Sequence, residues 1–351
     1  MRILIPVNID NRIDSNPFVR FLSEGLASYG HEVNCSIDEL WNHSIDYDLI
    51  FFQWPDVLLI DNQYETQCIE GLEKTLDTIR NNGVKTMITV HNLHPHNNNQ
   101  HICKLYDLIY DNIDVFHHMG NFSYELFKSK YPKAIHFVVP HSVNVQESLP
   151  VLKKECYKKK YGLPLDKPTV IAFGSFRNNE ERKMFLDLSH KYFFKCCFWA
   201  PQFNRFLDVE RGPIQKLTTR ILYRLQGVRM FRGAISDSQA IEMVMASDIL
   251  FIQRKDILNS GNLPLGFYGG CIVIGPDKGN VGDILQSTSN PVFDPNDKVS
   301  IHKALDRALV MISKQEHLGL KNAEYARKNW NRQIVMQKIN DNINKYVKTA
   351  S

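Results

Sequence analysis

The chain has 351 residues, a length typical of two domains or of one large domain. Apolar residues make up 43% and charged residues 23%, which excludes disordered and collagen-like chains, and the net charge of +4 is too small to indicate nucleic acid as the main ligand. No apolar run reaches the roughly 18–20 residues of a membrane span, and the apolar start is too short for a signal peptide, so we expect a cytoplasmic protein. No CxxC pair occurs, and we expect the cysteines to be reduced thiols.

Twelve short apolar runs predict β-strands, six in each half of the chain. Several, such as DLIFFQW and TVIAFG, are almost continuously apolar, which is typical of strands buried on both faces of a parallel sheet. Amphipathic stretches between the runs predict helices, for example Pro17–Tyr29, followed by Gly30, and Ser236–Ser247. This alternation predicts a doubly wound α/β architecture, with no internal repeat. The runs are Met1–Val7, Glu32–Ile37, Asp48–Trp54, Lys85–Leu93, Asp114–His118, Ile135–His141, Thr169–Ser175, Phe193–Ala200, Val228–Phe231, Asp248–Gln253, Cys271–Gly275 and Pro291–Phe293.

The two halves meet in a stretch rich in lysine and proline at residues 150–168. Five lysines between Lys153 and Lys160 and three nearby prolines predict a linker with a short helix. Asn322–Val347 has a long helical pattern with no strand after it. We therefore predict two Rossmann-like domains, at residues 1–150 and 165–321, with a final helix.

Polar side chains follow the predicted strands of the first half, where ligands of parallel sheets bind. The segment after the first strand has no GxGxxG motif but contains Asp10 and Asn16, the latter either a helix cap or a ligand contact. Trp54 follows the third strand. Three further strands end near histidines, which can exchange protons near neutral pH and so indicate a polar site. These histidines are His91, His117 and His141.

The loop after the fourth strand adds His94, His96 and His101 to His91. No two of the four have the i, i+4 spacing of a helical zinc site, and Pro95 indicates a loop. We therefore interpret them as loop or cleft-lining residues and predict no metal site.

Two segments of the second half suit a phosphate. The segment TVIAFG ends with Gly174 and is followed by Arg177, and the two indicate either a phosphate contact or a tight turn with a solvated arginine. Ser260–Gly261–Asn262 precedes a predicted helix, with Asn262 as its N-cap and Pro264 in its first turn. Backbone N–H groups at such a helix start can bind a diphosphate.

Together these segments resemble a GT-B-fold glycosyltransferase, closest to family 4 and its bacterial polysaccharide-assembly relatives. The resemblance covers residues 1–290 and depends on the order and spacing of segments that are weak individually. They are NPFVRFLSEGLASYGHEV, YDLIFFQWPD, KTMITVHNLHPH, FHHMGNFSYELF, FVVPHSVN, VIAFGSFRNNEERKMFL, ISDSQAIEMVMASDILF and LNSGNLPLGFYGGCIVIGPDKGNVGDIL.

The resemblance implies two Rossmann-like doubly wound domains facing across a cleft. The first, residues 1–150, would bind the acceptor and be joined by the final helix, residues 322–351; the second, residues 165–321, would bind a nucleotide-sugar donor. On the acceptor side we expect Asn16, Trp54, His96 and His141. The donor residues would be Gly174, Arg177, Lys183, Arg232, Gly233, Arg254, Ser260, Gly261, Asn262 and Asp283.

The sequence departs from the family pattern at two places. Two glutamates that the family usually carries eight positions apart fall at about Ile257 and Leu265. The lysine that commonly follows the first-strand arginine falls near Glu180, with Lys183 one turn later.

The activity implied is transfer of a sugar from a nucleotide-sugar to a glycan or lipid-linked glycan acceptor in surface polysaccharide synthesis. Family 4 implies retention of configuration; if the reaction inverts, His91, His117 and Asp10 are the candidate bases. Because the sequence has no DxD-type acidic pair after a strand, we expect neither metal nor cofactor. The alternatives are a nucleotide-sugar epimerase of the same fold and a non-catalytic sugar-nucleotide-binding or adaptor protein.

Arg205–Arg232 carries seven basic residues against Asp208 and Glu210, with apolar residues at helical spacing. Such a helix either packs its apolar face on the sheet or lies on an anionic membrane surface. The second interpretation implies a cytoplasmic protein peripherally bound to the inner face of the membrane.

Overall fold

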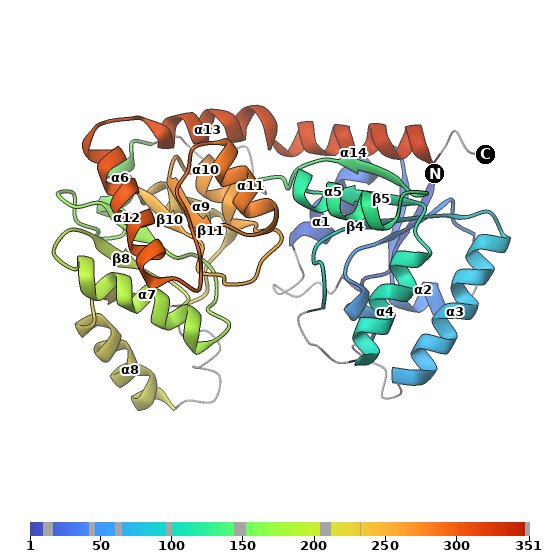
Figure 1. The fold of residues 1–351 in the computed structure, drawn as a ribbon, viewed down its shortest axis with the longest axis horizontal. Coiled ribbons are helices and arrows are strands. Elements are labelled where there is room, and N and C mark those ends of the chain that lie inside the picture. The colour runs from blue at the N-terminus through green and yellow to red at the C-terminus, as the bar shows by residue number, and fades with distance from the viewer. Residues whose placement is uncertain are drawn as a thin grey trace. The chain divides into compact units, whose positions relative to one another are not determined.

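The computed structural model describes residues 1–9, 17–41, 46–59, 65–95, 100–143, 152–203, 212–231 and 233–347. The chain forms two compact units (Figure 1). Unit 1 comprises Met1–Asn144 and Arg332–Ser351, and unit 2 comprises Val145–Asn331, where the sequence predicts boundaries at 150, 165 and 321. Within the described ranges, no helix is long and apolar enough to cross a membrane.

Unit 1 contains a six-stranded parallel sheet with the strand order β2-β1-β3-β4-β5-β6. In this register Ile3 of β1 lies between Val33 of β2 and Leu49 of β3. Each apolar run predicted in the first half contains one strand, so the predicted strand set is confirmed. The strands are β1 (Arg2–Ile5), β2 (Glu32–Cys35), β3 (Leu49–Phe52), β4 (Lys85–Thr89), β5 (Val115–His118) and β6 (Ile135–Val138).

Helices cover the sheet of unit 1, and one of them follows unit 2 in the chain. α1 ends at Ser28 and is followed by Gly30, whose φ of 81° is the left-handed conformation common after a helix C-terminus. α14 packs on α1 where Gly25 has no side chain: a Cβ there would lie 2.6 Å from Cε of Met336. The helices are α1 (Pro17–Ser28), α2 (Ile37–Trp41), the 3-10 helix η1 (Pro55–Leu59), α3 (Glu65–Asn81), α4 (Gln100–Asp111), α5 (Asn121–Lys130) and α14 (Arg332–Tyr346).

Unit 2 contains a second six-stranded parallel sheet, with the order β12-β11-β10-β7-β8-β9. The two doubly wound sheets confirm the predicted fold class. The strands are β7 (Thr169–Ile171), β8 (Cys197–Trp199), β9 (Val228–Arg229), β10 (Ile249–Phe251), β11 (Ile272–Pro276) and β12 (Val292–Phe293). The helices are α6 (Lys154–Lys160), α7 (Asn179–Tyr192), α8 (Pro213–Leu225), α9 (Asp237–Met245), α10 (Asn262–Tyr268), α11 (Gly279–Ser287), α12 (Lys298–Ser313) and α13 (Leu318–Asn329).

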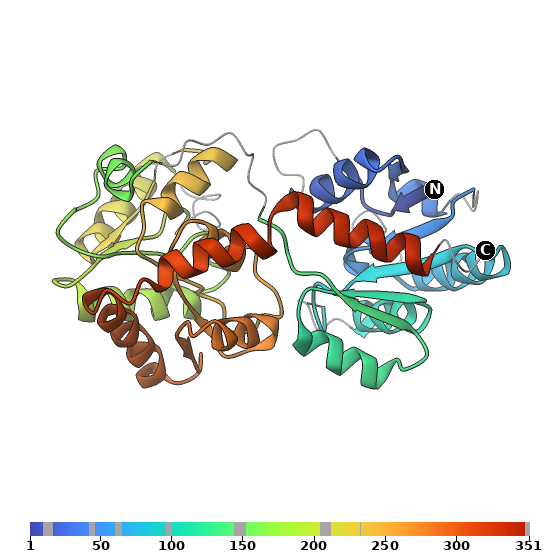
Figure 2. The ribbon, with the colours of Figure 1, turned by 90° about the horizontal axis from the view of Figure 1, so that it is seen from above.

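Two helical predictions need correction. The pattern over Asn322–Val347 is two helices, because the chain leaves helical geometry at Trp330 between α13 and α14 (Figure 2). The Trp330 ring is buried against Phe267 of unit 2, 4.9 Å between centroids, which fixes the end of α13. The isoleucine and leucine side chains of α8 do not pack on the sheet and are at least half exposed, whereas Tyr223 packs against the core.

The two sheets share one short sequence pattern. DLIFFQ at residues 48–53 and DILFIQ at 248–253 form β3 and β10, each beside the first strand of its sheet. Asp48 Oδ2 accepts a hydrogen bond from the Arg2 N–H (2.7 Å), and Asp248 Oδ2 accepts one from the Thr169 N–H (2.8 Å). The aspartate at the start of each strand therefore fixes its register against the first strand.

Candidate functional site

The strand order of the unit 2 sheet reverses between the neighbouring strands β7 and β10, so their carboxyl ends form its topological switch point. β7 continues to β8 on one side of the sheet, and β10 continues to β11 on the other. Open α/β sheets bind ligands at such a point. The loop after β7 carries Gly174, and the loop after β10 leads to Ser260–Gly261–Asn262, so the structure brings these predicted donor residues to one edge.

Asn262 connects the two loops. Its Nδ2–H donates to the Phe173 carbonyl oxygen (2.7 Å), and Nε2–H of Gln253 donates to the same oxygen (3.3 Å). Gly174 has φ +86°, and a Cβ there would lie 3.7 Å from Asn262 Nδ2. The prediction that Asn262 caps α10 is wrong, because the cap position is Gly261 and the Asn262 side chain bonds across to the other loop.

Several polar groups at this edge have no protein partner. Among the described residues, no acceptor is present for the backbone N–H groups of Gly174, Ser175, Ser260 and Gly261. Gln253 is 1% exposed, and its Oε1 is also unpaired. Buried polar atoms normally have partners, so the unpaired Oε1 of Gln253 indicates a polar ligand beside the switch point. The two glycines and two serines are half-buried or exposed, which leaves their N–H groups open to such a ligand. We call Gly174, Ser175, Gln253, Ser260 and Gly261 the β7/β10 edge.

Two arginines near the β7/β10 edge differ in what they contact. Arg254 forms an ion pair with buried Glu181 and donates to the Ser175 carbonyl oxygen (2.9 Å). Burial, followed by the charge of Arg177, lowers the pKa of Arg254. Arg177 is exposed; its backbone N–H donates to Glu181 Oε2 (2.7 Å), and its guanidinium has no hydrogen bond or ion pair within the described residues. Arg177 is therefore the cation available to a ligand, and Arg254 holds the loop.

Lys183, Gly233 and Asp283 take no part in the contacts described above. Lys183 is exposed on α7 and Asp283 is exposed on α11. Gly233 follows β9 with φ +96° and open space where a Cβ would stand. Arg232 lies outside the described residues, and no hydrogen bond in the described part joins Lys183 or Gly233 to the β7/β10 edge.

In unit 1, aromatic rings gather beyond the carboxyl ends of β3, β4 and β6. His91 stacks on Trp54, with 3.9 Å between centroids and 19° between planes. Phe18 of α1 contacts both rings and His141, at 5.0 Å from His91, 6.3 Å from Trp54 and 5.4 Å from His141. His91 Nε2 hydrogen-bonds to Oε1 of Gln53 (3.0 Å), whose Nε2 is buried and unpaired. We call these five residues the aromatic cluster.

His91 and His141 of the aromatic cluster and the neighbouring His117 differ in the hydrogen bonds that their ring nitrogens make. In His117, Nε2–H donates to the Val139 carbonyl oxygen (2.9 Å), so Nδ1 accepts from Thr89 Oγ1–H (3.1 Å), and neither nitrogen is available to a substrate. In His141, Nδ1–H donates to the Ser142 carbonyl oxygen (2.7 Å), which leaves Nε2 unprotonated and without a partner in the described part of the chain.

Burial is the largest cause that lowers the pKa of all three histidines, and it lowers that of His117 to about 4. All three are therefore neutral at pH 7. The predicted residues Asp10, Asn16 and His96 lie outside the described residues.

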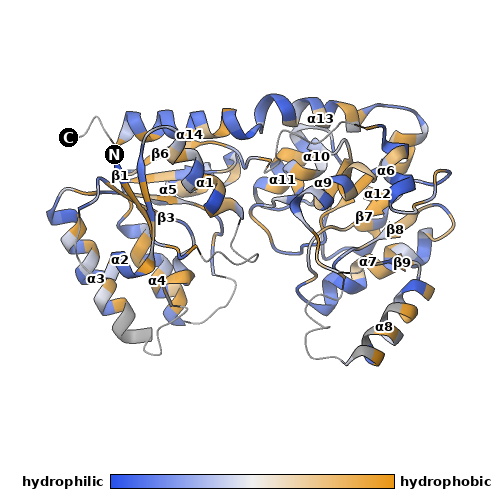
Figure 3. Cartoon of the chain, turned by 180° about the vertical axis from the view of Figure 1, so that it is seen from behind, coloured by the Kyte–Doolittle hydropathy of each residue, from blue (hydrophilic) through white to orange (hydrophobic). Residues whose placement is uncertain are grey.

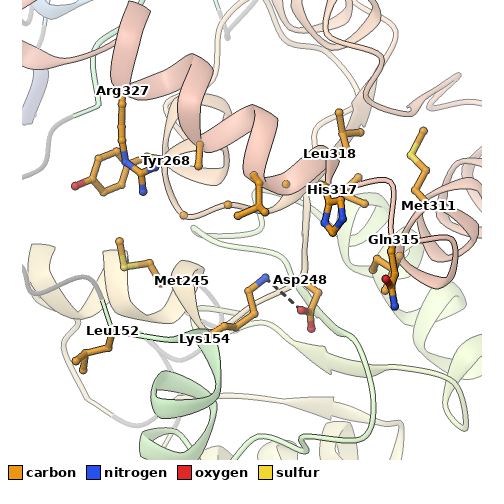
Figure 4. Close-up of a pocket in the computed structure, with 17 residues that line it drawn as sticks. Leu152, Lys154, Met245, Asp248, Tyr268, Met311, Gln315, His317, Leu318 and Arg327 are labelled. Atoms are coloured by element: carbon orange, nitrogen blue, oxygen red, sulfur yellow. Dashed lines mark hydrogen bonds and ion pairs between the residues drawn. The ribbon is translucent and has the colours of Figure 1, made fainter.

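The pocket in Figure 4 lies at the opposite, amino end of the unit 2 sheet. It encloses about 400 Å³, and its walls include Lys154 and Asp248, which form an ion pair (Nζ–Oδ1 3.2 Å). Asp248 precedes β10, so this pocket is separated from the β7/β10 edge by the length of the strand. No predicted site residue lines it. In the residues described, no cluster of three histidine, cysteine or acidic side chains could hold a metal ion.

Solved structures share the whole architecture at low sequence identity. A sucrose-phosphate synthase from Thermosynechococcus elongatus superposes with a TM-score of 0.73 at 14% identity, covering 100% of this chain and 99% of that chain. HepE of Anabaena in complex with UDP-glucose gives 0.68 at 11% identity, covering 98% and 100%. An α,α-trehalose 6-phosphate synthase from Burkholderia multivorans gives 0.62 at 10% identity, covering 99% and 97%. The chain has the GT-B fold. No protein-family model and no curated protein sequence matches it.

Within this GT-B fold, the sequence reasoning missed the residues that position the others. Gln53 and Gln253 each end an apolar strand run, and a polar residue at that place is a signal that could have singled them out. Phe18 gave no signal beyond helical periodicity. The contact of Glu181 with Arg254 joins positions 73 residues apart, and nothing in the local sequence indicates it.

Proposed function

We propose that unit 2 binds the diphosphate of a nucleotide-sugar at the β7/β10 edge and that the protein transfers the sugar to an acceptor. The observation that carries this proposal is the convergence of unpaired N–H groups from two loops with the exposed guanidinium of Arg177. Oriented N–H groups and a cation are the groups that bind phosphate oxygens in proteins. Supporting this, HepE has been solved with UDP, with UDP and glucose, and with UDP-glucose.

The same groups suit the chemistry of transfer. The bond from the anomeric carbon to the phosphate oxygen breaks, the acceptor oxygen bonds to that carbon, and negative charge develops on the nucleoside diphosphate. Arg177 and the N–H groups would stabilise this charge without a metal ion. Following the family 4 resemblance, we propose retention of configuration, with the acceptor proton passing to the leaving phosphate on the same face.

We further propose that unit 1 binds a glycan or lipid-linked glycan acceptor at the aromatic cluster. Trp54, which is partly exposed and held by the buried Phe18 and the stacked His91, offers apolar surface to a sugar ring. The unprotonated Nε2 of His141 can accept a hydrogen bond from a sugar hydroxyl. In an inverting reaction, His141 is better placed than His117 to take a proton, because both nitrogens of His117 are bonded within the protein. Surface polysaccharide synthesis at the inner membrane face is the setting that we propose.

Calorimetry with UDP and UDP-glucose, followed by product analysis, tests the proposal. UDP-sugar should bind, and UDP should be released with transfer of the sugar when an acceptor glycan is added, or with slow hydrolysis in its absence. Inversion at C2 of the sugar would instead identify an epimerase. Tight binding without turnover over a panel of acceptors would identify an adaptor. No binding of any nucleoside diphosphate would overturn the proposal.

A further inference from the structure

α8 exposes an unusual amount of apolar surface. Ile214 and Leu225, near its two ends, are 79% and 78% exposed. Leu217, Ile221 and Leu222 between them are all at least half exposed. Large apolar side chains that gather on a surface in this way mark a binding face. In Figure 3, α8 lies at the periphery of unit 2 with several hydrophobic residues along it.

The opposite side of α8 holds the helix on the protein. Tyr223 packs on buried Phe203 at 4.8 Å between ring centroids. Ile214, Leu217, Ile221 and Leu225 follow one another at spacings of three and four, so they form a single stripe, and Tyr223 is about half a turn away from it. Docking through Tyr223 therefore turns Ile214 and Leu225 away from the core. Leu217 and Ile221 are half exposed and line a pocket of about 350 Å³ with Tyr161 and Trp199.

A second element extends this apolar surface. Phe193 and Phe194 follow α7 and are exposed, Phe194 by 84%. The Phe193 ring lies against Gly227, just after α8: a Cβ added at Gly227 would be 2.7 Å from Cδ2 of Phe193. The two rings contact each other at 5.3 Å. We call the exposed apolar residues of α8, with Phe193 and Phe194, the α8 patch.

Basic residues surround the α8 patch. The chain has no acidic residue from Arg211 to Ser236. Arg224 is exposed on α8, and exposed Lys191 and Lys195 flank the phenylalanine pair. A second copy of the chain placed on the same surface would bring these like charges together, whereas anionic lipid headgroups would neutralise them.

We propose that the α8 patch docks unit 2 on an anionic membrane surface. The apolar stripe and Phe194 enter the boundary between headgroups and acyl chains, and Arg224, Lys191 and Lys195 contact lipid phosphates. This proposal does not depend on the donor site, because the α8 patch contains no residue of the β7/β10 edge.

Vesicle flotation of the full chain tests it. The wild type should float with vesicles of phosphatidylcholine and phosphatidylglycerol at low salt, less at high salt, and little with phosphatidylcholine alone. Ile214→Ser/Leu225→Ser should weaken partition by about tenfold or more, as should Phe194→Ser, since each change removes apolar surface from the bilayer. Arg224→Gln should weaken binding at low salt only. The matched control is Leu320→Ser on α13, where Leu320 is 68% exposed, and it should float like the wild type.

Nucleoside diphosphate affinity should be the same in the wild type and in these variants. Equal affinities would show that the variants are folded and that any loss of vesicle binding does not come from the donor site. The proposal is overturned if the wild type fails to float with the anionic vesicles. It is also overturned if the α8 substitutions leave flotation unchanged. A wild-type dimer in solution that Ile214→Ser/Leu225→Ser converts to a monomer would assign the α8 patch to self-association instead.

Discussion

Arg254→Met should destabilise unit 2 without directly touching the proposed donor. The substitution leaves the carboxylate of Glu181, 4% exposed, without its cation. Removing one partner of a buried ion pair costs about 3–5 kcal/mol. We expect the lower end, about 3 kcal/mol, because Glu181 keeps the hydrogen bond from the Arg177 N–H. For a unit of this size, about 2–4 °C per kcal/mol gives a fall of about 6–12 °C in Tm.

Thermal unfolding and calorimetry of nucleoside diphosphate binding measure the two effects separately. Glu181→Gln added to Arg254→Met should recover part of the loss, because it removes the uncompensated charge. Arg177→Met is the matched control: its free energy of unfolding should stay within about 0.5 kcal/mol of the wild type, about 1–2 °C in Tm, since the side chain is exposed. Its affinity should fall by about 10- to 150-fold, from the loss of a charged hydrogen bond of about 1.5–3 kcal/mol. A wild-type Tm for Arg254→Met, or wild-type affinity for Arg177→Met, would refute this reasoning.

Three further predictions concern the donor contact, a buried histidine and the metal requirement. Gly261→Val should reduce nucleoside diphosphate affinity, because the added side chain would obstruct the approach of the phosphate. The fold should be unchanged, because Gly261 has an ordinary φ of −63°. The control is Gly212→Val at the N-cap of α8, where φ is −68°, and equal affinities in the two variants would contradict the assignment. The pKa of His117 is lowered from 6.5 to about 4 by burial, so its stabilising neutral form is complete above pH 6.5 and is lost as the pH falls to 4. Urea unfolding should show that the free energy of unfolding of unit 1 falls by up to about 3 kcal/mol over that pH range, and that it falls less in His117→Gln. A wild-type free energy of unfolding that does not change with pH would exclude the effect. Sugar transfer should persist in EDTA; activity that EDTA abolishes and magnesium or manganese restores would show that a metal is required.

The strands could be predicted from the sequence, but which face of a helix packs on the core could not. Every predicted apolar run coincides with a strand. Central strands such as β3 are buried along their whole length, which requires a continuous apolar run, whereas the edge strands β2 and β6 are only partly buried. The helical period of α8 was equally clear. Whether its apolar side faces the core depends on the distant contact between Tyr223 and Phe203, which periodicity does not contain. The break at Trp330 was missed because apolar spacing continues through it.

The site could be located in part, but the roles within it could not be assigned. The glycine after the strand and the glycine before the helix both lie at the β7/β10 edge in the structure, and the binding of a donor there stays a prediction. Asn262 was expected to cap its own helix, yet its side chain bonds to the Phe173 carbonyl oxygen, a partner 89 residues away. Arg177 and Arg254 look alike in sequence, and only the burial of Glu181 distinguishes the one that is committed to the protein.

The position of α14 has a consequence for the order in which the chain folds during synthesis. Unit 2 is continuous from Val145 to Asn331, so it can complete its core as soon as it leaves the ribosome. Unit 1 cannot, because Val335, Met336, Ile339 and Ile343 of α14 belong to its core. Its first 144 residues must therefore wait, with the surface under α14 uncovered, while all of unit 2 is translated. The usual sequence of folding from the N-terminal domain onward is thus reversed in this chain, and chaperones have most to protect in its first half.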